Sequence, residues 1–160
     1  MIDEIDRKLV GLLQANAHLS NADLAESVGL TASSVFERVK KLEQKGVITG
    51  YVATVDPVKL GKPILAFMRL SFDATQGLAS APGRIDELAA REPDILECYE
   101  VAGDDGLILK LRAAGAHELR RLIASIRDHA RCSRTATSLV LGSIKEKGAI
   151  APAVEGREAE

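Results

Sequence analysis

Tryptophan is absent from this chain of 160 residues, aromatic residues make up only 3% of it, and its two cysteines, Cys98 and Cys132, form no C-x-x-C pair. Without paired cysteines, a disulfide-stapled scaffold is excluded, and reduced, buried or incidental thiols are expected. Long apolar runs are lacking too, since no stretch approaches the ~18 residues that a membrane-spanning helix needs. Residues 1–6 are charged at once and do not resemble a secretory leader. The sequence therefore predicts a cytoplasmic protein with no membrane partner.

An excess of charge of one sign is also lacking. The chain has 21 Lys and Arg against 23 Asp and Glu, a formal net charge of −2, while 46% of its residues are hydrophobic. This composition predicts a globular protein of one domain or two small ones. Because no overall positive charge attracts it to nucleic acid, any DNA binding has to come from a local basic surface.

Signals for catalysis and for metal binding are weak. His18, His117 and His129 lie far apart, with no i, i+4 pair and no neighbouring cysteine in a ligand pattern. The chain has neither a G-x-S-x-G segment nor a glycine-rich phosphate loop. We therefore predict no catalytic residue, no metal site and no cofactor.

Residues 20–46 have the pattern of two short amphipathic helices joined by a glycine turn. Ser20 and Thr31 suit the N-cap positions of these helices, and Gly29 and Gly46 suit their ends. The predicted buried stripe of the second helix consists of Val35, Val39 and Leu42. A further helix, capped by Asp3, packs Ile5, Leu9, Leu12 and Leu13 against this pair and runs to about Asn16. The pattern is typical of a helix-turn-helix that reads DNA.

The outward face of the second helix carries side chains that suit DNA. Small hydroxyl residues at its start permit close approach to phosphates or base edges, Arg38 can read guanine with two parallel donors, and lysines neutralise phosphates. The predicted DNA-binding residues are Ser20, Asn21, Thr31, Ser33, Ser34, Glu37, Arg38, Lys40, Lys41 and Lys45. The alternative is a solvated helix face without a partner. Residues 31–45 carry four cations and two anions, so one copy of the helix has few positive charges with which to contact phosphates. We therefore expect a symmetric dimer, in which two helices double the number of phosphate contacts.

The chain after residue 46 divides into a wing, a linker and a second domain. Residues 47–56 alternate apolar and polar side chains, which predicts a strand or wing, so the helix-turn-helix domain is expected to span 1–57 and a linker 58–63. Residues 146–160 are small, acidic and rich in helix breakers, which predicts a flexible tail. The alternative is that Ile150 and Val154 pack on a neighbouring subunit.

Residues 64–145 predict a regular α+β domain. Strands are expected at 64–72, 95–102, 107–113 and 135–141, helices at 84–91 and 117–129, and a loop at 73–83. The order strand, helix, strand, strand, helix, strand is the ferredoxin-like βαββαβ arrangement, with both helices on one face of an antiparallel sheet. The uncovered face needs a partner, and a second copy of the chain is the simplest one.

Ordered motifs in both halves resemble one known family. They are I-D-R-K-L at 5–9, L-S-N-A-D-L-A at 19–25, V-G-L-T at 28–31, E-R-V-K-K-L-E at 37–43, G-V-I-T-G-Y at 46–51, I-L-E-C-Y-E-V-A-G-D at 95–104 and S-R-T-A-T-S-L-V-L at 133–141. Over about residues 1–145 the chain resembles the leucine-responsive regulator and asparagine-regulator (Lrp/AsnC) family of transcription factors. The resemblance implies a DNA-binding domain joined by a β-strand linker to a regulatory domain, with dimers that assemble into octamers and bind an amino acid.

The resemblance also implies an effector site at a loop of the type G-D-Y-D and near the last strand. The matching residues here are Gly103, Asp104, Asp105, Gly106, Thr135, Thr137 and Ser138. Asp105 stands at the aromatic position and Gly106 replaces the second aspartate, which leaves two adjacent carboxylates suited to an ammonium group or a cationic side chain. The alternative is a plain hairpin turn, in which Asp-Gly supplies positive φ values.

The sequence thus predicts a DNA-binding transcriptional regulator and not an enzyme. As a dimer or octamer it is expected to read palindromic operators under the control of a small-molecule effector, an amino acid. One alternative is an enzyme that resembles sirohaem decarboxylases, which share this architecture and use histidines in a cleft, but the histidines here do not cluster. Another alternative is an effector-binding oligomeric module that no longer binds DNA.

Overall fold

The computed structural model describes residues 2–72 and 82–146. They form two compact units, of which the first contains the chain up to Ala53 together with Lys145 and Glu146, and the second spans Thr54–Ile144. Most of the predicted loop at 73–83, and all of the predicted tail except residue 146, lie outside the described residues, as do Ile150 and Val154. In the part of the chain that the structure describes, no helix is long and apolar enough to cross a membrane.

The first unit is a three-helix domain whose helices begin at the predicted residues. They are α1 (Glu4–Ala15), α2 (Asn21–Val28) and α3 (Ala32–Gln44). Asp3, Ser20 and Thr31 are the N-caps, and each side chain accepts a hydrogen bond from a backbone N–H in the first turn, as these residue types favour. Gly29 ends α2 with a φ of 71°, a left-handed conformation that costs glycine little.

A small apolar core holds these helices together. Its buried members are Leu9, Leu13, Leu24, Ala25 and Val35, and partly buried residues such as Ile5, Leu12 and Val39 pack against them. Leu42 is buried as well, so the predicted stripe of α3 is confirmed, with Val39 at its edge. The stripe fixes which side of α3 faces away from the core.

Residues 47–56, predicted as a strand or wing, form no strand in the described chain. Regular structure passes directly from α3 to the first strand of the second unit, and Val52 is 89% exposed. An alternating sequence becomes a strand only when it pairs with a neighbouring strand, and no strand of the described residues pairs with it here. The backbone N–H groups of Val47 and Ile48 donate instead to the carbonyl of Leu42, at 2.9 and 3.2 Å. The hydroxyl group of Tyr51 instead donates a 2.8 Å hydrogen bond to Glu43 at the end of α3.

The predicted linker 58–63 is mostly a compact turn. Backbone N–H groups of Leu60 and Lys62 donate to the carbonyls of Asp56 and Pro57, at 3.2 and 2.8 Å. Lys62 also forms an ion pair with Asp94, which precedes the second strand of the second unit. This turn therefore belongs to the second unit.

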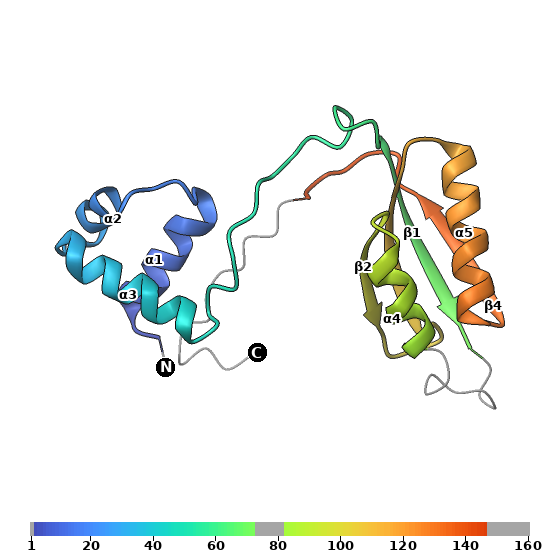
Figure 1. Ribbon diagram of the computed structural model, residues 1–160, viewed down its shortest axis with the longest axis horizontal. Helices are drawn as coiled ribbons and strands as arrows, with labels where there is room; N and C mark the ends of the chain where they lie inside the picture. The colour runs from blue at the N-terminus through green and yellow to red at the C-terminus, as the bar shows by residue number, and fades with distance from the viewer. Residues whose placement is uncertain (1, 73–81, 147–160) are drawn as a thin grey trace. The chain divides into compact units, whose positions relative to one another are not determined.

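The second unit has the predicted ferredoxin-like topology. Its elements are β1 (Ile64–Ser71), α4 (Pro82–Arg91), β2 (Ile95–Glu100), β3 (Leu107–Ala113), α5 (Ala116–Ala130) and β4 (Arg134–Leu139). The sheet order is β2-β3-β1-β4 and every neighbouring pair is antiparallel. Both helices pack on one face of the sheet (Figure 1), where Ile85, Leu122 and Ile126 meet Met68 and Leu109.

The other face of the sheet is more polar than the apolar sequence of β1 suggests. Phe67 and Arg69 are exposed on it, between Lys110 and Ile108 of β3 and Ser138 and Ala136 of β4. The Nζ of Lys110 lies 3.2 Å from a carboxylate oxygen of Glu97 on β2. This uncovered face therefore mixes apolar side chains with paired charges.

Truncating the centre of the sheet should unfold the second unit more easily. Leu109 is 0% exposed, so we expect Leu109→Ala to lower the free energy of unfolding by about 2–5 kcal/mol, through lost burial and the cavity left behind. Leu60→Ala removes the same atoms from an exposed side chain and is the control. Urea unfolding followed by circular dichroism measures both variants, and equal effects would contradict this packing.

Candidate DNA-binding helix and effector loop

Three hydroxyl side chains gather at the exposed start of α3. The Oγ1 of Thr31 accepts from the backbone N–H of Ser34 at 3.2 Å, and lies 2.9 Å from the Oγ of Ser34 and 3.1 Å from the Oγ of Ser33. The residues are exposed, and the first turn of a helix also presents free N–H groups and the positive end of its dipole. This end of α3 is therefore suited to approach an anionic backbone.

Cationic side chains follow along the same side of α3. Ser34, Arg38, Lys41 and Lys45, together with Glu37, Leu42 and Asp6 of α1, line a hollow of about 270 Å³. Lys41 and Lys45 are exposed and form no ion pair with any of the described residues. Lys40 is absent from this hollow, and its Nζ lies 6.0 Å from the ring centroid of Phe36. The predicted lysines thus divide between two sides of the helix.

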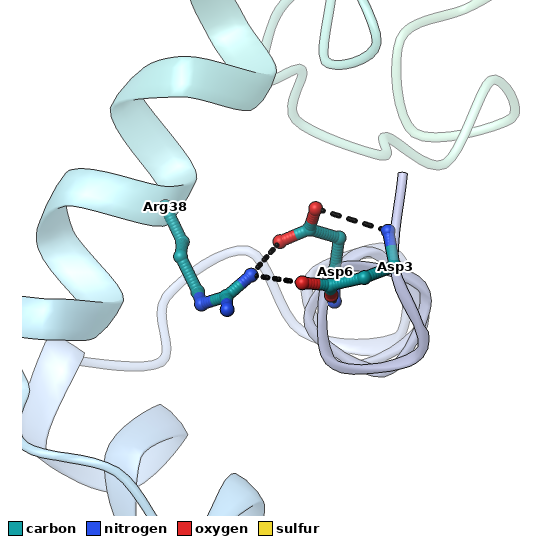
Figure 2. Close-up of polar contacts among 3 residues, drawn as sticks. All are labelled: Asp3, Asp6 and Arg38. Carbon is teal, nitrogen blue, oxygen red and sulfur yellow. Dashed lines mark hydrogen bonds and ion pairs between the residues drawn. The ribbon is translucent and has the colours of Figure 1, made fainter. Parts of the chain in front are cut away.

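Arg38 is not free on the outward face, contrary to the prediction. Figure 2 shows its guanidinium directed at the start of α1, where the Nη1 lies 2.6 Å from the Oδ2 of Asp3 and 2.8 Å from the Oδ1 of Asp6. The side chain of Arg38 is 32% exposed and that of Asp6 15%. Sequence reasoning identified Asp3 only as an N-cap and did not identify Asp6.

These contacts change the acidity of the groups that make them. The backbone N–H of Asp6, and then the guanidinium of Arg38, lower the pKa of the Asp3 carboxyl. The two carboxylates, Asp3 first, raise the pKa of Arg38. Arg38 therefore stays a cation and Asp3 an anion over a wider pH range than in isolation.

Of the predicted residues at the start of α2, Ser20 forms a capping box with Asp23. Ser20 and Asp23 bond each other through both backbone N–H groups and through the Ser20 hydroxyl, which donates at 2.6 Å. The hydroxyl and the N–H of Ser20 lower the pKa of Asp23. Asn21 follows as an exposed side chain in the first turn. Ser20 is thus engaged in the cap, while Asn21 is open to solvent.

The loop between β2 and β3 holds four of the predicted effector residues, Gly103, Asp104, Asp105 and Gly106. Gly103 has a φ of 123°, which is the positive value that the predicted Asp-Gly turn needed, but Gly106 does not have one. The backbone N–H of Gly106 instead donates at 2.8 Å to the carbonyl of Leu70 on β1, and its carbonyl accepts from Val101 at 3.1 Å. The positive φ value of the turn is therefore at Gly103, while the backbone hydrogen bond of Gly106 to Leu70 attaches the loop to the sheet.

The two adjacent carboxylates of this loop differ in their surroundings. The Oδ1 of Asp105 accepts a 3.0 Å hydrogen bond from Ser71, and its Oδ2 lies 3.8 Å from the guanidinium of Arg69. Asp104 is exposed and forms no ion pair with a described residue. Sequence reasoning missed Arg69 and Ser71, although their alternation with the buried Leu70 places both on the uncovered face.

The three predicted residues of β4 lie on different faces of the sheet. Thr135 and Thr137 are opposite Leu70 and Met68, whose side chains face the helices, whereas Ser138 is opposite Phe67 on the uncovered face. Side chains directly opposite in an antiparallel pair point to the same face. The structure therefore groups Ser138 with the face of Arg69, and separates the two threonines from it.

Other reactive groups are few among the described residues. No cluster of three or more His, Cys, Asp or Glu side chains is placed there to hold a metal ion. Cys98 and Cys132 are partly buried, and this burial raises the pKa of both thiols, so each stays protonated and a weak nucleophile. The thiols therefore fill space beside the apolar core of the second unit.

Removing the charge of Asp3 should make the free energy of unfolding depend less on pH at acidic pH. The folded-state pKa of Asp3 is lowered, so its contribution is fully present above the ordinary value of about 3.9 and is lost as the pH falls through the lower folded value. Asn is an equally good N-cap but does not titrate. The free energy of unfolding of Asp3→Asn should therefore fall less steeply below about pH 5. Urea unfolding of both proteins over this range measures the difference, and parallel curves would contradict the lowered pKa of Asp3.

Two family models match the chain. A winged helix-turn-helix DNA-binding model covers residues 2–49, and the Lrp/AsnC ligand binding domain covers residues 66–150. Each match coincides with one of the two structural units. The DNA-binding match contains α1, α2 and α3, and the ligand-binding match contains the sheet and the loop at Gly103–Gly106.

Individual relatives match almost the whole chain. The HTH-type transcriptional regulator LrpA of Mycobacterium tuberculosis is 34% identical over 143 residues, which cover 89% of this chain and 91% of LrpA. The HTH-type transcriptional regulator FL11 of Pyrococcus horikoshii is 32% identical over 148 residues, covering 91% of this chain and 93% of FL11. A solved structure of a feast or famine regulatory protein from M. tuberculosis, complexed with L-methionine, has a TM-score of 0.84 at 32% identity and covers 95% of this chain and 100% of that one.

The relatives named here are transcriptional regulators, and their family is not enzymatic. The alternative of an enzyme resembling sirohaem decarboxylases is therefore wrong. A capped helix-turn-helix unit and a ferredoxin-like unit, each matched by its own family model, make this chain a member of the Lrp/AsnC family of transcriptional regulators.

Proposed function

We propose that this regulator binds palindromic operators as a dimer, inserts α3 into the major groove and responds to an amino acid. The observation that carries the proposal is the exposed side of α3. It presents hydroxyl groups at the helix start and the unpaired cations Lys41 and Lys45 further along. Hydroxyls at a helix start and cations one or two turns later suit a helix that enters a groove between two phosphate backbones.

The small number of free cations supports binding as a dimer. Arg38 is paired within the domain, so the phosphate contacts of one chain fall mainly to Lys40, Lys41 and Lys45. Since affinity rises with the number of phosphates that are neutralised, two copies bound to one palindrome double this number. The uncovered face of the sheet, with exposed Phe67 and Tyr99, is the surface through which we expect copies to associate into dimers and octamers.

An amino acid is the effector that the loop at 103–106 fits best. The similar M. tuberculosis regulator is complexed with L-methionine. A zwitterion brings one ammonium group and one carboxylate, and we assign the exposed Asp104 to the first and the half-exposed Arg69 to the second. Asp105, already bonded to Ser71, orients the loop between these groups. Ser138, on the same face as Arg69, is the candidate from β4 for a contact to the effector side chain, whereas Thr135 and Thr137 lie opposite residues that face the helices.

Neutralising a lysine of α3 should weaken DNA binding on all sequences alike. We expect Lys41→Met to reduce the slope of log affinity against log salt concentration by about 1, because one phosphate contact is lost. Lys59→Met removes the same charge from the exposed turn before β1 and serves as the control. Fluorescence anisotropy measures binding to a duplex that the wild-type protein selects from a random-sequence library. Equal slopes for the wild type and Lys41→Met would show that Lys41 contacts no phosphate.

Neutralising Asp104 should weaken effector binding. A ligand that binds only the folded state raises the melting temperature, so a thermal-shift screen against the twenty amino acids identifies the effector. Asp104→Asn should shrink the shift, because the ammonium group loses a charged partner. The control, Asp128→Asn, changes an exposed carboxylate on α5. If Asp104→Asn gives the full wild-type shift, the ammonium group does not bind Asp104.

A further inference from the structure

The capping box of α1 is completed by a side chain from another helix. Asp3 accepts the N–H of Asp6 with its Oδ1, at 2.8 Å, and Asp6 accepts the N–H of Asp3 with its Oδ2, at 3.2 Å. The remaining oxygen of each carboxylate accepts from the Nη1 of Arg38, at 2.6 and 2.8 Å. All four carboxylate oxygens are therefore used, two for the cap and two for α3 (Figure 2).

We propose that Arg38 is a positioning residue, which fixes α3 to the capping box of α1 through Asp3 and Asp6 and reads no base. The inference rests on the proposed function, in which α3 enters the major groove. It assigns a part in DNA recognition to two acidic residues of α1. Carboxylates are repelled by a phosphate backbone, so nothing in their own chemistry would suggest such a role.

The place of Arg38 on α3 favours this role over base reading. Arg38 follows the buried Val35 by three positions and precedes the buried Leu42 by four, so it lies beside the apolar stripe rather than opposite to it. Ser33 and Glu37 lie nearly opposite to the stripe, and Lys41 lies between Glu37 and Arg38 around the helix.

Moving the guanidinium to a base would also have a cost. It would leave the Asp6 carboxylate, which is only 15% exposed, without its cation. A partly buried charge that loses its partner is destabilising, whereas the exposed Lys41 gives up no ion pair on reaching a phosphate. The charge balance points the same way, because one guanidinium faces two carboxylates and offers little net attraction to a phosphate.

A double-mutant cycle between Asp6 and Arg38 tests the proposal. The variants are Asp6→Asn, Arg38→Met and the double variant, with Arg38→Lys as the conservative replacement and Lys41→Met as the matched control on the same side of α3. Asn keeps an acceptor for the N–H of Asp3 but loses the charge that pairs with Arg38. Binding to the selected duplex and to its single-base-pair variants is measured at several salt concentrations, at a temperature where circular dichroism shows every variant folded.

A positioning role has a specific signature in this cycle. Asp6→Asn and Arg38→Met should each weaken binding several-fold on all duplexes, and the double variant should be no worse than Arg38→Met alone. The salt slope should stay at the wild-type value for these variants but fall for Lys41→Met. Arg38→Lys should recover part of the affinity, because one cation still reaches the carboxylates.

Other outcomes overturn the inference. If Asp6→Asn binds as tightly as the wild type while Arg38→Met loses discrimination at a single base pair, Arg38 reads that base. If Arg38→Met lowers the salt slope as Lys41→Met does, its remaining N–H groups contact a phosphate. In both cases the wild type binds its duplex and the proposed function stands. A wild-type protein that selects no sequence overturns the proposed function and this inference together.

Discussion

One ion-pair cluster fixes the orientation of α3 relative to α1. The buried core of the first unit is small and consists of Leu9, Leu13, Leu24, Ala25, Val35 and Leu42. Apolar contacts are not directional, so a small core fixes the angle between helices less specifically than a polar contact does. A guanidinium held by two carboxylates has a fixed direction, and it joins the first turn of α1 to the middle of α3. Asp3 is exposed and its ion pair contributes little to stability, whereas the pair with the partly buried Asp6 is costly to break, and together the two pairs fix the direction of Arg38.

A comparable polar contact organises the second unit. The carboxylate of Asp105 joins the β2–β3 loop to the end of β1 through Ser71, and the N–H of Gly106 adds a backbone bond to Leu70. The loop is therefore anchored to the central part of the sheet, since β1 lies between β3 and β4. A ligand that contacts the loop acts on β1, which is hydrogen-bonded to both β3 and β4, so a displacement of β1 is passed to both neighbouring strands.

Most of the fold follows from local chemistry, whereas the polar contacts of the sites do not. Helix starts and element types depend on residues within a few positions of one another, and these can be read directly from the sequence. The N-caps Asp3, Ser20 and Thr31 are predicted in this way, as is the order of the six elements after residue 63. Arg38 and Asp6 are 32 residues apart, and Ser71 and Asp105 are 34 apart, so only the folded chain brings them together. Helical spacing from Val35 could have placed Arg38 beside the core. Residues 47–56 do not form a strand, because an alternation of apolar and polar side chains does not by itself provide a neighbouring strand to pair with.

The turn at 56–62 has a consequence for avidity. Because its backbone bonds and the ion pair of Lys62 with Asp94 make it part of the second unit, the irregular chain that joins the two units ends at about Asp56 rather than at the start of β1. When two modules share a tether, the local concentration of one near the other rises as the tether becomes shorter, provided that it still spans the distance. If copies of the chain associate through their sheets, as proposed, each residue taken into this turn raises the effective concentration of the second DNA-binding unit at its half of a palindrome.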